Sequence, residues 1–444
     1  MALIEQWTAA FANLVWGLPL VIMLVSSGIF FTIYFGFPQI RFFKQAIKII
    51  LGHYDDPANK GEISHFQALT AALSATVGLG NIAGVAVAVT IGGPGAVFWL
   101  WVAGFIGMCT KFTEVTLSLM HREVSNDGTV NGGPMFVIKN GLSRKFLPLA
   151  WIYALFTILS SLGAGNMFQA NQMASVVEST TGIPKWASGL IFCTLAGLIL
   201  IGGIKRIGKV TEKLVPLMIF IYMGGALYII YTHLNLIPDV FSQILTGAFS
   251  GTAATGAFTG VAIKEVVING IKRASFSNEA GLGSSAMAHS AAKSTPVQEG
   301  IVALLEPLID TIVVCSITAF AILLTNTWSM PGIQGSDMTA VAFESVLGPF
   351  GRYIVTLTVA LFAFSTMISW SYYGEQGITF IFGKKFIPAY RVVFLLMIFV
   401  GSILQLGIVL NLSDALYGML AFPNLIACYL LLPKIKEAVK KYQA

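Results

Sequence analysis

The strongest constraint on the fold is a series of long apolar segments that repeats along nearly the whole chain. A helix needs about 20 apolar residues to cross the hydrocarbon core of a bilayer, and by that rule the sequence contains about eleven spans. Only 10% of the 444 residues are charged, against about 25% in a typical soluble domain. We therefore predict an all-α, multi-pass membrane protein. The predicted spans lie near 15–36, 66–90, 95–120, 149–177, 185–203, 212–231, 259–290, 300–324, 350–373, 389–410 and 412–432.

The lysines and arginines predict the orientation, because both residues are enriched in cytoplasmic loops. They gather in alternate loops, after the first, third, fifth and ninth spans and in the tail. This pattern predicts a cell-membrane protein with its N-terminus outside and its C-terminus in the cytoplasm. It also accounts for the net charge of +6 without a nucleic-acid partner. The clusters begin at Arg41, Arg122, Lys205, Lys384 and Lys434.

A short glycine motif occurs twice, once in each half of the chain. Gly78-Leu79-Gly80 lies in the second span and Gly281-Leu282-Gly283 in the seventh. Glycine allows a backbone to leave helical dihedrals and allows another group to approach closely. Paired broken helices in two repeated halves mark the substrate site of many secondary transporters. The main alternative is tight helix packing through small residues. A dinucleotide-binding loop would need a strand before the motif and an acidic residue about 20 positions after it, and the sequence has Ala96-Val97-Phe98-Trp99 there, with no acid.

The spans also predict an internal repeat. With the first span set aside, ten spans divide into two groups of five, and an odd number of spans per group makes the two halves inverted. An axis in the membrane plane would then bring the two glycine motifs together near the midplane. We expect an extra N-terminal helix and cytoplasmic loop (1–61), a first repeat (62–233), a second repeat (234–433) and a basic cytoplasmic tail (434–444).

Three longer motifs resemble those of one transporter family. They are Gly92-Gly93-Pro94-Gly95 with the residues up to Gly104, Asn131-Gly132-Gly133-Pro134-Met135, and Asn278-Glu279-Ala280-Gly281. The chain is similar in order and over its whole length to the alanine/glycine:cation symporter family. The resemblance implies a LeuT-like fold, with one N-terminal helix, a 5+5 inverted-repeat core and two broken helices. It implies a transporter that carries alanine or glycine with sodium into the cell by alternating access, with no cofactor besides the coupling ion and no enzymatic activity.

The first break is the expected substrate site. The amides of Leu79, Gly80 and Asn81 would begin a half-helix, and the partial positive charge of a helix N-terminus suits a carboxylate. Thr76 directly precedes the break and is assigned to the same site. A packing kink that binds nothing is the alternative.

The fourth span contributes polar side chains to the expected site. Asn166 and Gln169 belong to a cluster of amides that is costly in a membrane unless it faces protein or water. We expect Gln169 to hold the substrate, with Asn166 as the second choice and Phe168 beside them. Helix–helix hydrogen bonding is the alternative.

Two aromatic residues predict a small pocket. Trp370 lies one helical turn beyond Thr366 on the same face, and Phe276 lies just before the second break. Together they would restrict the pocket to a ligand with a very small side chain, with Gly281 of the second break close to it. The alternative for Trp370 is an anchor at the membrane interface.

Sodium needs several oxygen ligands, and a broken helix supplies carbonyls for them. The carbonyls of Ser74 and Val77 are candidates, and the ninth span carries the adjacent hydroxyls of Ser365 and Thr366. The resemblance places these hydroxyls, with the carbonyl of Phe362, at the sodium site of LeuT-like proteins, and places Thr366 at the substrate as well. Hydroxyls bonded back to their own helix are the alternative.

The deepest acidic residues are Glu114 and Glu279, and each is costly within a bilayer. The resemblance implies that Glu114 braces the broken helices, whereas Glu279 would brace the second break or meet the substrate amine. We expect Lys111, one turn before Glu114, to pair with it. Titration of Glu114 or Glu279 during transport would make the symport proton-coupled, which is the alternative mechanism. Glu306 and Asp310 in the eighth span receive no role.

Overall fold

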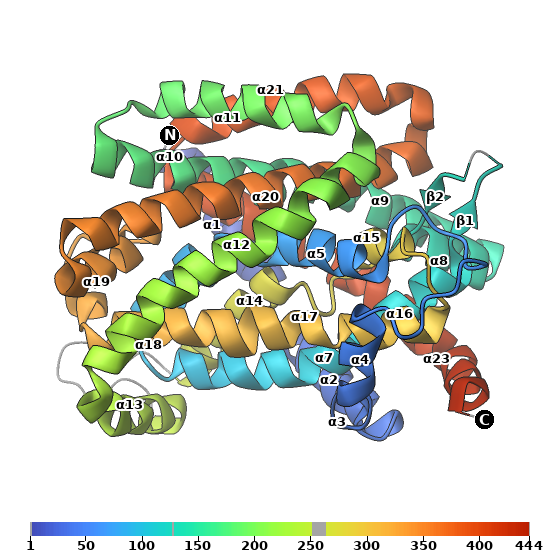
Figure 1. Ribbon diagram of the computed structural model, residues 1–444, viewed down its shortest axis with the longest axis horizontal. Helices are drawn as coiled ribbons and strands as arrows, with labels where there is room; N and C mark the ends of the chain where they lie inside the picture. The colour runs from blue at the N-terminus through green and yellow to red at the C-terminus, as the bar shows by residue number, and fades with distance from the viewer. Residues whose placement is uncertain (1, 127, 251–262, 444) are drawn as a thin grey trace.

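The computed structural model describes residues 2–126, 128–250 and 263–443, and it is built almost entirely of helices (Figure 1). Within these residues the strands form one two-stranded antiparallel ribbon, β1 (Glu123–Val124) and β2 (Val130–Asn131). The ribbon connects α7 (Ala96–His121) to α8 (Pro134–Gly141). The predicted all-α class is therefore confirmed.

The first half of the chain begins with α1, a helix that was not predicted, and α2, which corresponds to the predicted first span, 15–36. Besides α7 and α8, the helical elements up to residue 232 comprise long helices, short connecting helices and two π-helical turns. They are α1 (Ala2–Val15), α2 (Leu18–Tyr34), α3 (Pro38–Arg41), α4 (Phe43–Ile50), α5 (His65–Thr76), η1 (Gly80–Gly84), α6 (Val85–Gly92), η2 (Arg144–Phe146), α9 (Leu147–Leu162), η3 (Gly163–Met167), α10 (Phe168–Thr181), α11 (Lys185–Leu200) and α12 (Gly203–Thr232).

The second half also alternates long and interrupted helices. They are η4 (Leu234–Leu236), α13 (Ile237–Ser250), α14 (Ile263–Asn278), α15 (Ala286–Ser290), α16 (Pro296–Ala303), α17 (Leu305–Pro307), η6 (Leu308–Cys315), α18 (Ser316–Leu324), η7 (Thr327–Ser329), α19 (Ser336–Leu347), α20 (Pro349–Phe382), η8 (Lys384–Phe386), α21 (Ile387–Ile403), α22 (Leu406–Gly418) and α23 (Ala421–Gln443).

Eight helical segments in the described part of the chain are long and apolar enough to cross a membrane, and the bent pair of α5 with η1–α6 makes a ninth. The two other predicted spans are α11, which has 16 residues, and the interrupted segment α14–α15. The predicted start of that segment, 259–262, lies outside the described residues. The total of eleven spans and the inverted relation of the two halves therefore stay predictions.

The predicted boundary between the last two spans is wrong. We expected one span to end at 410 and the next to begin at 412, but α21 ends at Ile403 and α22 begins at Leu406. Leu404 leaves the helix with an extended backbone, at φ −73° and ψ 162°. The residues on both sides of this turn are apolar, so hydropathy alone contained no signal for its position.

The long helices enclose the two interrupted segments. In Figure 1, α12 crosses diagonally in front of α5 and α20 and packs on both, while α11 and α21 lie side by side along one edge. On the other side of the molecule, α7 packs against α14 and α16. Every residue from 68 to 86 and from 268 to 292 is buried. Irregular backbone at membrane depth is tolerated only where it is buried in protein or lines a water-filled cavity. Both breaks meet this requirement because they are buried in protein.

Candidate substrate and sodium site

The first break separates α5 from η1 and α6, whose axes differ by 48°. Its glycines are required for close approach, because neither has a positive φ. A Cβ added to Gly78 would lie 2.4 Å from Oγ1 of Thr366, and one added to Gly80 would lie 3.1 Å from Cα of Ser277. Any larger residue here would push α20 or α14 away from the break.

The second break runs from the end of α14 at Asn278 to the start of α15 at Ala286. Here the glycines are required for backbone conformation, with φ of +91° at Gly281 and +75° at Gly283. Glu279 also has a positive φ, +60°, which is uncommon for a residue other than glycine. The same sequence motif therefore opens the two helices for different physical reasons.

A small cavity lies against the first break. Its volume is about 10 Å³, close to the space that one water molecule needs. Five of the residues predicted to bind substrate line it, together with four residues that were not predicted. The lining residues are Thr76, Gly80, Gln169, Phe276 and Trp370, and in addition Ala75, Gly78, Ala164 and Tyr417.

Gln169 faces the break, whereas Asn166 does not. The amide of Leu79 donates a hydrogen bond of 3.2 Å to Oε1 of Gln169. The side chain of Asn166 instead donates to the carbonyl of Phe394 in α21, over 2.6 Å. The reason is the π-helical turn η3, which ends just before α10 and changes the angular spacing that would place the two amides on one face.

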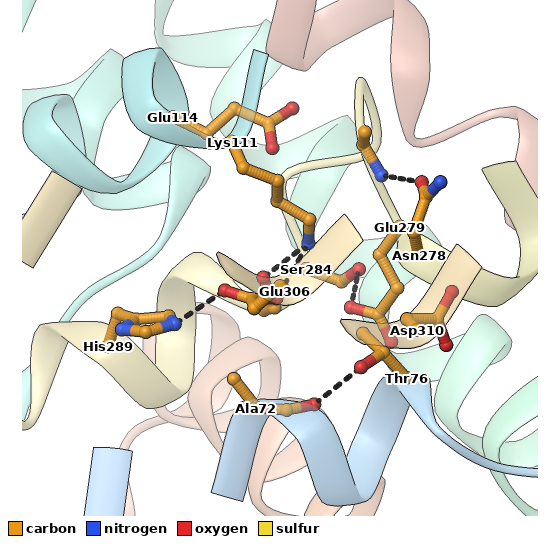
Figure 2. Close-up of polar contacts among 12 residues, drawn as sticks. Ala72, Thr76, Lys111, Glu114, Asn278, Glu279, Ser284, His289, Glu306 and Asp310 are labelled. Atoms are coloured by element: carbon orange, nitrogen blue, oxygen red, sulfur yellow. Dashed lines mark hydrogen bonds and ion pairs between the residues drawn. The ribbon is translucent and has the colours of Figure 1, made fainter. Parts of the chain in front are cut away.

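The side chain of Asn81 connects the backbone of the first break to Asp310. Its Oδ1 accepts a hydrogen bond of 2.9 Å from the amide of Gly78, and its Nδ2 donates 2.7 Å to Oδ1 of Asp310. The same carboxylate oxygen accepts from Ser277 over 3.0 Å. Asp310, which the sequence left without a role, thus connects the first break to α14. The hydroxyl of Thr76 bonds to its own helix, at the carbonyl of Ala72 (Figure 2).

An aromatic wall closes the cavity on the other side. The ring of Phe276 contacts Phe168 and Tyr417, with centroid distances of 5.4 and 5.1 Å, and Tyr417 contacts Trp370 at 5.4 Å. Trp370 is only 2% exposed, so it packs inside the protein and does not act as an interface anchor. A Cβ on Gly165 would lie 2.3 Å from Cγ of this indole. Tyr417 was missed by the sequence analysis.

A buried ion cluster covers Phe276. The guanidinium of Arg273 donates to both carboxylate oxygens of Asp414, at 3.1 and 2.5 Å, and Lys272 lies 2.6 Å from the same carboxylate. The guanidinium carbon is 5.5 Å from the centroid of the Phe276 ring. The cluster joins α14 to α22 beside the aromatic wall of the cavity.

Of the residues predicted to bind sodium, four form one cluster of oxygens between α5 and α20, namely Ser74, Phe362, Ser365 and Thr366. Oγ1 of Thr366 donates to the carbonyl of Ser74 over 2.9 Å, and the hydroxyl of Ser74 donates to the carbonyl of Ser365 over 2.7 Å. The hydroxyl of Ser365 donates to the carbonyl of Phe362 over 3.0 Å, so it bonds back to its own helix, as in the alternative for these hydroxyls. Val77, the C-cap residue of α5, is buried three residues beyond Ser74. Thr366 therefore bonds across to the broken helix, unlike a hydroxyl that merely satisfies its own helix.

The predicted acidic residues both contact the second break. Oε1 of Glu114 accepts from the amide of Gly281 over 2.9 Å and from Nδ2 of Asn424 over 2.6 Å. Oε2 of Glu279 accepts from the hydroxyl of Ser284 over 2.5 Å, across the break itself. Figure 2 shows Glu114, Glu279 and Ser284 around the interrupted segment. Gly281 therefore lies at Glu114 and is not part of the cavity lining.

The expected partner of Glu114 is wrong. Nζ of Lys111 forms its ion pair with Glu306, at 3.3 Å, and donates a short hydrogen bond to Ser285 (Figure 2). Lys111 and Glu306 are both fully buried. Glu306 comes from α17, a helix far from Lys111 in the sequence, so local spacing could not identify this pair.

The chain is similar to known transporters over its whole length. A model of the sodium:alanine symporter family matches residues 1–444. The chain is 39% identical over 436 residues to the sodium/alanine symporter AgcS of Methanococcus maripaludis, covering 97% of this chain and 95% of that protein. It is 35% identical over 435 residues to the probable sodium/glutamine symporter GlnT of Bacillus subtilis, covering 97% and 89%.

A solved structure shows the same fold. The structure of MhsT in complex with L-phenylalanine matches with a TM-score of 0.56 at 14% identity, covering 84% of this chain and 99% of that one. The expected LeuT-like fold is confirmed by this match. The protein is an integral membrane transporter and not an enzyme, and its chain belongs to the sodium:alanine symporter family.

Proposed function

We propose that this protein is a secondary active transporter that carries alanine or glycine into the cell together with sodium by alternating access. The observation that carries the proposal is the meeting of two sites at Thr366. Its hydroxyl belongs to the oxygen cluster through Ser74, and it lies against Gly78, which lines the cavity.

The carboxylate of the amino acid would bind at the first break. The amide of Leu79 already points to a carbonyl oxygen, that of Gln169. A substrate carboxylate can take the place of this oxygen, because a half-helix N-terminus favours an anion. Gln169 would then turn to donate its amide to the substrate.

The size of the cavity favours the smallest amino acids. With about 10 Å³ between Gln169, Phe276, Trp370 and Tyr417, any substrate must displace side chains on binding. Displacement costs more as the ligand grows, since overpacked side chains leave their preferred rotamers. Alanine or glycine requires the smallest displacement.

Sodium would bind to the oxygens of Ser74, Val77, Phe362, Ser365 and Thr366. Carbonyl and hydroxyl oxygens suit a hard cation, and unwound carbonyls bind sodium in broken-helix transporters. A site of neutral oxygens between α5 and α20 would connect ion binding to the position of the broken helix.

The remaining assignments follow from this mechanism. Glu114 and Glu279 would hold the shape of the second break while α5 moves. The two repeats, 62–233 and 234–433, would each supply one broken helix. The N-terminus would face the outside, so that the basic loops lie in the cytoplasm.

Equilibrium binding tests the proposal. Purified protein should bind labelled alanine in sodium, and exchanging sodium for choline at fixed pH and ionic strength should weaken binding at least about tenfold, a loss of about 1.4 kcal/mol. Equal affinity in both salts, with a strong dependence on pH, would favour proton coupling through Glu114 or Glu279 instead.

A further inference from the structure

A row of buried titratable side chains connects the second break to the face predicted to be cytoplasmic. The row begins at Glu306, whose carboxylate oxygen lies 2.5 Å from Nε2 of His289. Nδ1 of His289 lies 2.7 Å from one carboxylate oxygen of Glu299. The second oxygen of Glu299 lies 2.7 Å from Nδ1 of His65. His65 is 3% exposed and the three others are fully buried.

The two contacts of His289 require an extra proton. A neutral imidazole carries hydrogen on one nitrogen only, and its other nitrogen is an acceptor. Both nitrogens of His289 nevertheless lie within hydrogen-bond distance of a carboxylate oxygen. Either the imidazole is protonated or one of the two carboxyl groups is, and in both cases the trio holds one proton more than a neutral histidine and two carboxylates.

The charge balance leads to the same conclusion. Lys111, paired with Glu306, contributes one positive charge to this dry region. A protonated His289 supplies the second and thereby balances Glu299 and Glu306, with His65 neutral. Without that proton these five side chains (Lys111, His65, His289, Glu299 and Glu306) would together carry a net charge of −1, which is unfavourable away from water.

His65 gives the row access to water. It lines a cavity of about 260 Å³ at the surface, together with Asp55, Ser64 and Lys293. Asp55 is 61% exposed, and its carboxylate lies 3.7 Å from Nε2 of His65. Protons can therefore reach Glu299 through His65 from one side of the membrane, the side predicted to be cytoplasmic.

The row joins the moving parts of the proposed mechanism. His65 is the first residue of α5, and His289 lies in α15, so each interrupted segment contributes one histidine. A backbone hydrogen bond also connects the segments next to these ends, since the amide of Lys293 donates to the carbonyl of Ile63 over 2.8 Å. Arg122 adds hydrogen bonds to carbonyls of the loop after α15, including that of Ala292 at 2.7 Å.

We propose that His289, Glu299 and Glu306 form a proton-binding site, filled through His65, whose proton holds the cytoplasmic ends of α5 and α15 closed. When the proton leaves through His65, a nitrogen lone pair and a carboxylate oxygen face each other without a hydrogen. The resulting repulsion, together with the unbalanced charge, favours separation of α5 and α15 from α16. Acidic cytoplasm closes this end, and alkaline cytoplasm opens it.

The neighbouring charges set where this site titrates. The two carboxylates favour the proton, and Lys111 opposes it. Other groups face the trio from the surrounding elements. They are His65 of α5 with Asp55 beyond it, Arg122 after α7, Tyr373 of α20, and Glu114 and Glu279, which interact with Lys111.

The test measures opening directly and does not depend on the identity of the substrate. Spin labels at Lys60→Cys and Lys145→Cys, both exposed, would report the distance between the start of α5 and the start of α9. A Cys193→Ser background removes the one native cysteine that is not buried. In the full-length protein, the fraction of long distances should rise from about pH 6 to about pH 10, a range that brackets a histidine stabilised by carboxylates.

Three variants decide the origin of this dependence. His289→Asn should lose the pH dependence. Glu299→Gln, which keeps an acceptor oxygen but removes one charge, should shift the midpoint to lower pH, whereas a merely structural role would not move it. His53→Asn, at an exposed loop histidine, should behave like the parent protein.

Two results would overturn the proposal. One is a parent distance distribution that does not change with pH. The other is an unchanged pH midpoint in both Glu299→Gln and His289→Asn. If His289→Asn does not fold, Glu299→Gln decides alone, and an unchanged midpoint in that variant overturns the proposal.

Discussion

The hydroxyl of Thr366 in α20 donates a hydrogen bond of 2.9 Å to the carbonyl of Ser74, near the end of α5. The same oxygen lies so close to the backbone of Gly78 that a Cβ there would approach it to 2.4 Å. One side chain therefore contacts the oxygen cluster and the wall of the cavity. In the proposed mechanism this contact lets sodium binding and substrate binding support each other.

Replacing Thr366 with valine removes one oxygen at nearly constant volume. We expect the sodium concentration for half-maximal alanine binding to rise about tenfold, equivalent to about 1.4 kcal/mol. Thr358→Val is the matched control, because Thr358 is also buried in α20 but bonds to the carbonyl of Ile354 in its own helix. If both variants show the parental sodium dependence, Thr366 is not a sodium ligand.

Trp370 should limit the size of the substrate. A hydrophobic pocket separates ligands that differ by one methylene by about 1–3 kcal/mol, so the parent should bind glycine and alanine and reject leucine. Trp370→Leu should admit valine or leucine and weaken alanine, whose methyl group loses contacts. Competition binding with a series of amino acids measures this, and a parental size ranking in the variant would contradict the role of Trp370 as a pocket wall.

Gly165 should control the position of Trp370. In Gly165→Ala the new Cβ would lie 2.3 Å from the indole, so the indole must move into the cavity and alanine affinity should fall about tenfold, about 1.4 kcal/mol. Gly224→Ala is the control, because no atom lies within 4 Å of a Cβ at that position. The double variant Gly165→Ala, Trp370→Leu should lose less affinity than the two single losses combined. Strict additivity would show that the residues do not interact.

Glu114 should matter for stability through its oxygen atom and not through its charge. Oε1 accepts two hydrogen bonds at the second break, whereas Oε2 is buried with no partner among the described residues. Glu114→Gln keeps an acceptor and should be tolerated. Glu114→Leu leaves the backbone amide of Gly281 and one N–H of the Asn424 side chain without an acceptor, at about 1–3 kcal/mol each. Thermal unfolding in detergent should rank Leu well below Gln, and equal stabilities would argue against the brace.

Much of the fold was predictable, because membrane helices leave a local signal. The long apolar runs and the two glycine motifs depend on residues that are close in sequence, so the fold class and the position of both breaks could be inferred. Five cavity residues, including Gln169 and Trp370, followed from the same patterns with the family resemblance. Asn166, which was also predicted to bind substrate, does not line the cavity, since it lies in the π-helical turn η3 and bonds to α21.

The remaining features depend on contacts between distant parts of the chain. Tyr417 reaches the cavity from α22, and Asn424 reaches Glu114 from α23. His65 and His289 both contact Glu299, and no spacing in the sequence connects them. Such pairs become visible only when the packing of the helices is known.

Uptake into sealed proteoliposomes tests the central claim most directly. With a sodium gradient directed inward, at equal pH on both sides and with the membrane potential clamped, labelled alanine should accumulate above its external concentration. Accumulation should disappear when choline replaces sodium or when an ionophore dissipates the gradient, because only differential binding of sodium couples the two movements. Accumulation that persists without a sodium gradient, or that follows an imposed pH gradient instead, would contradict the account.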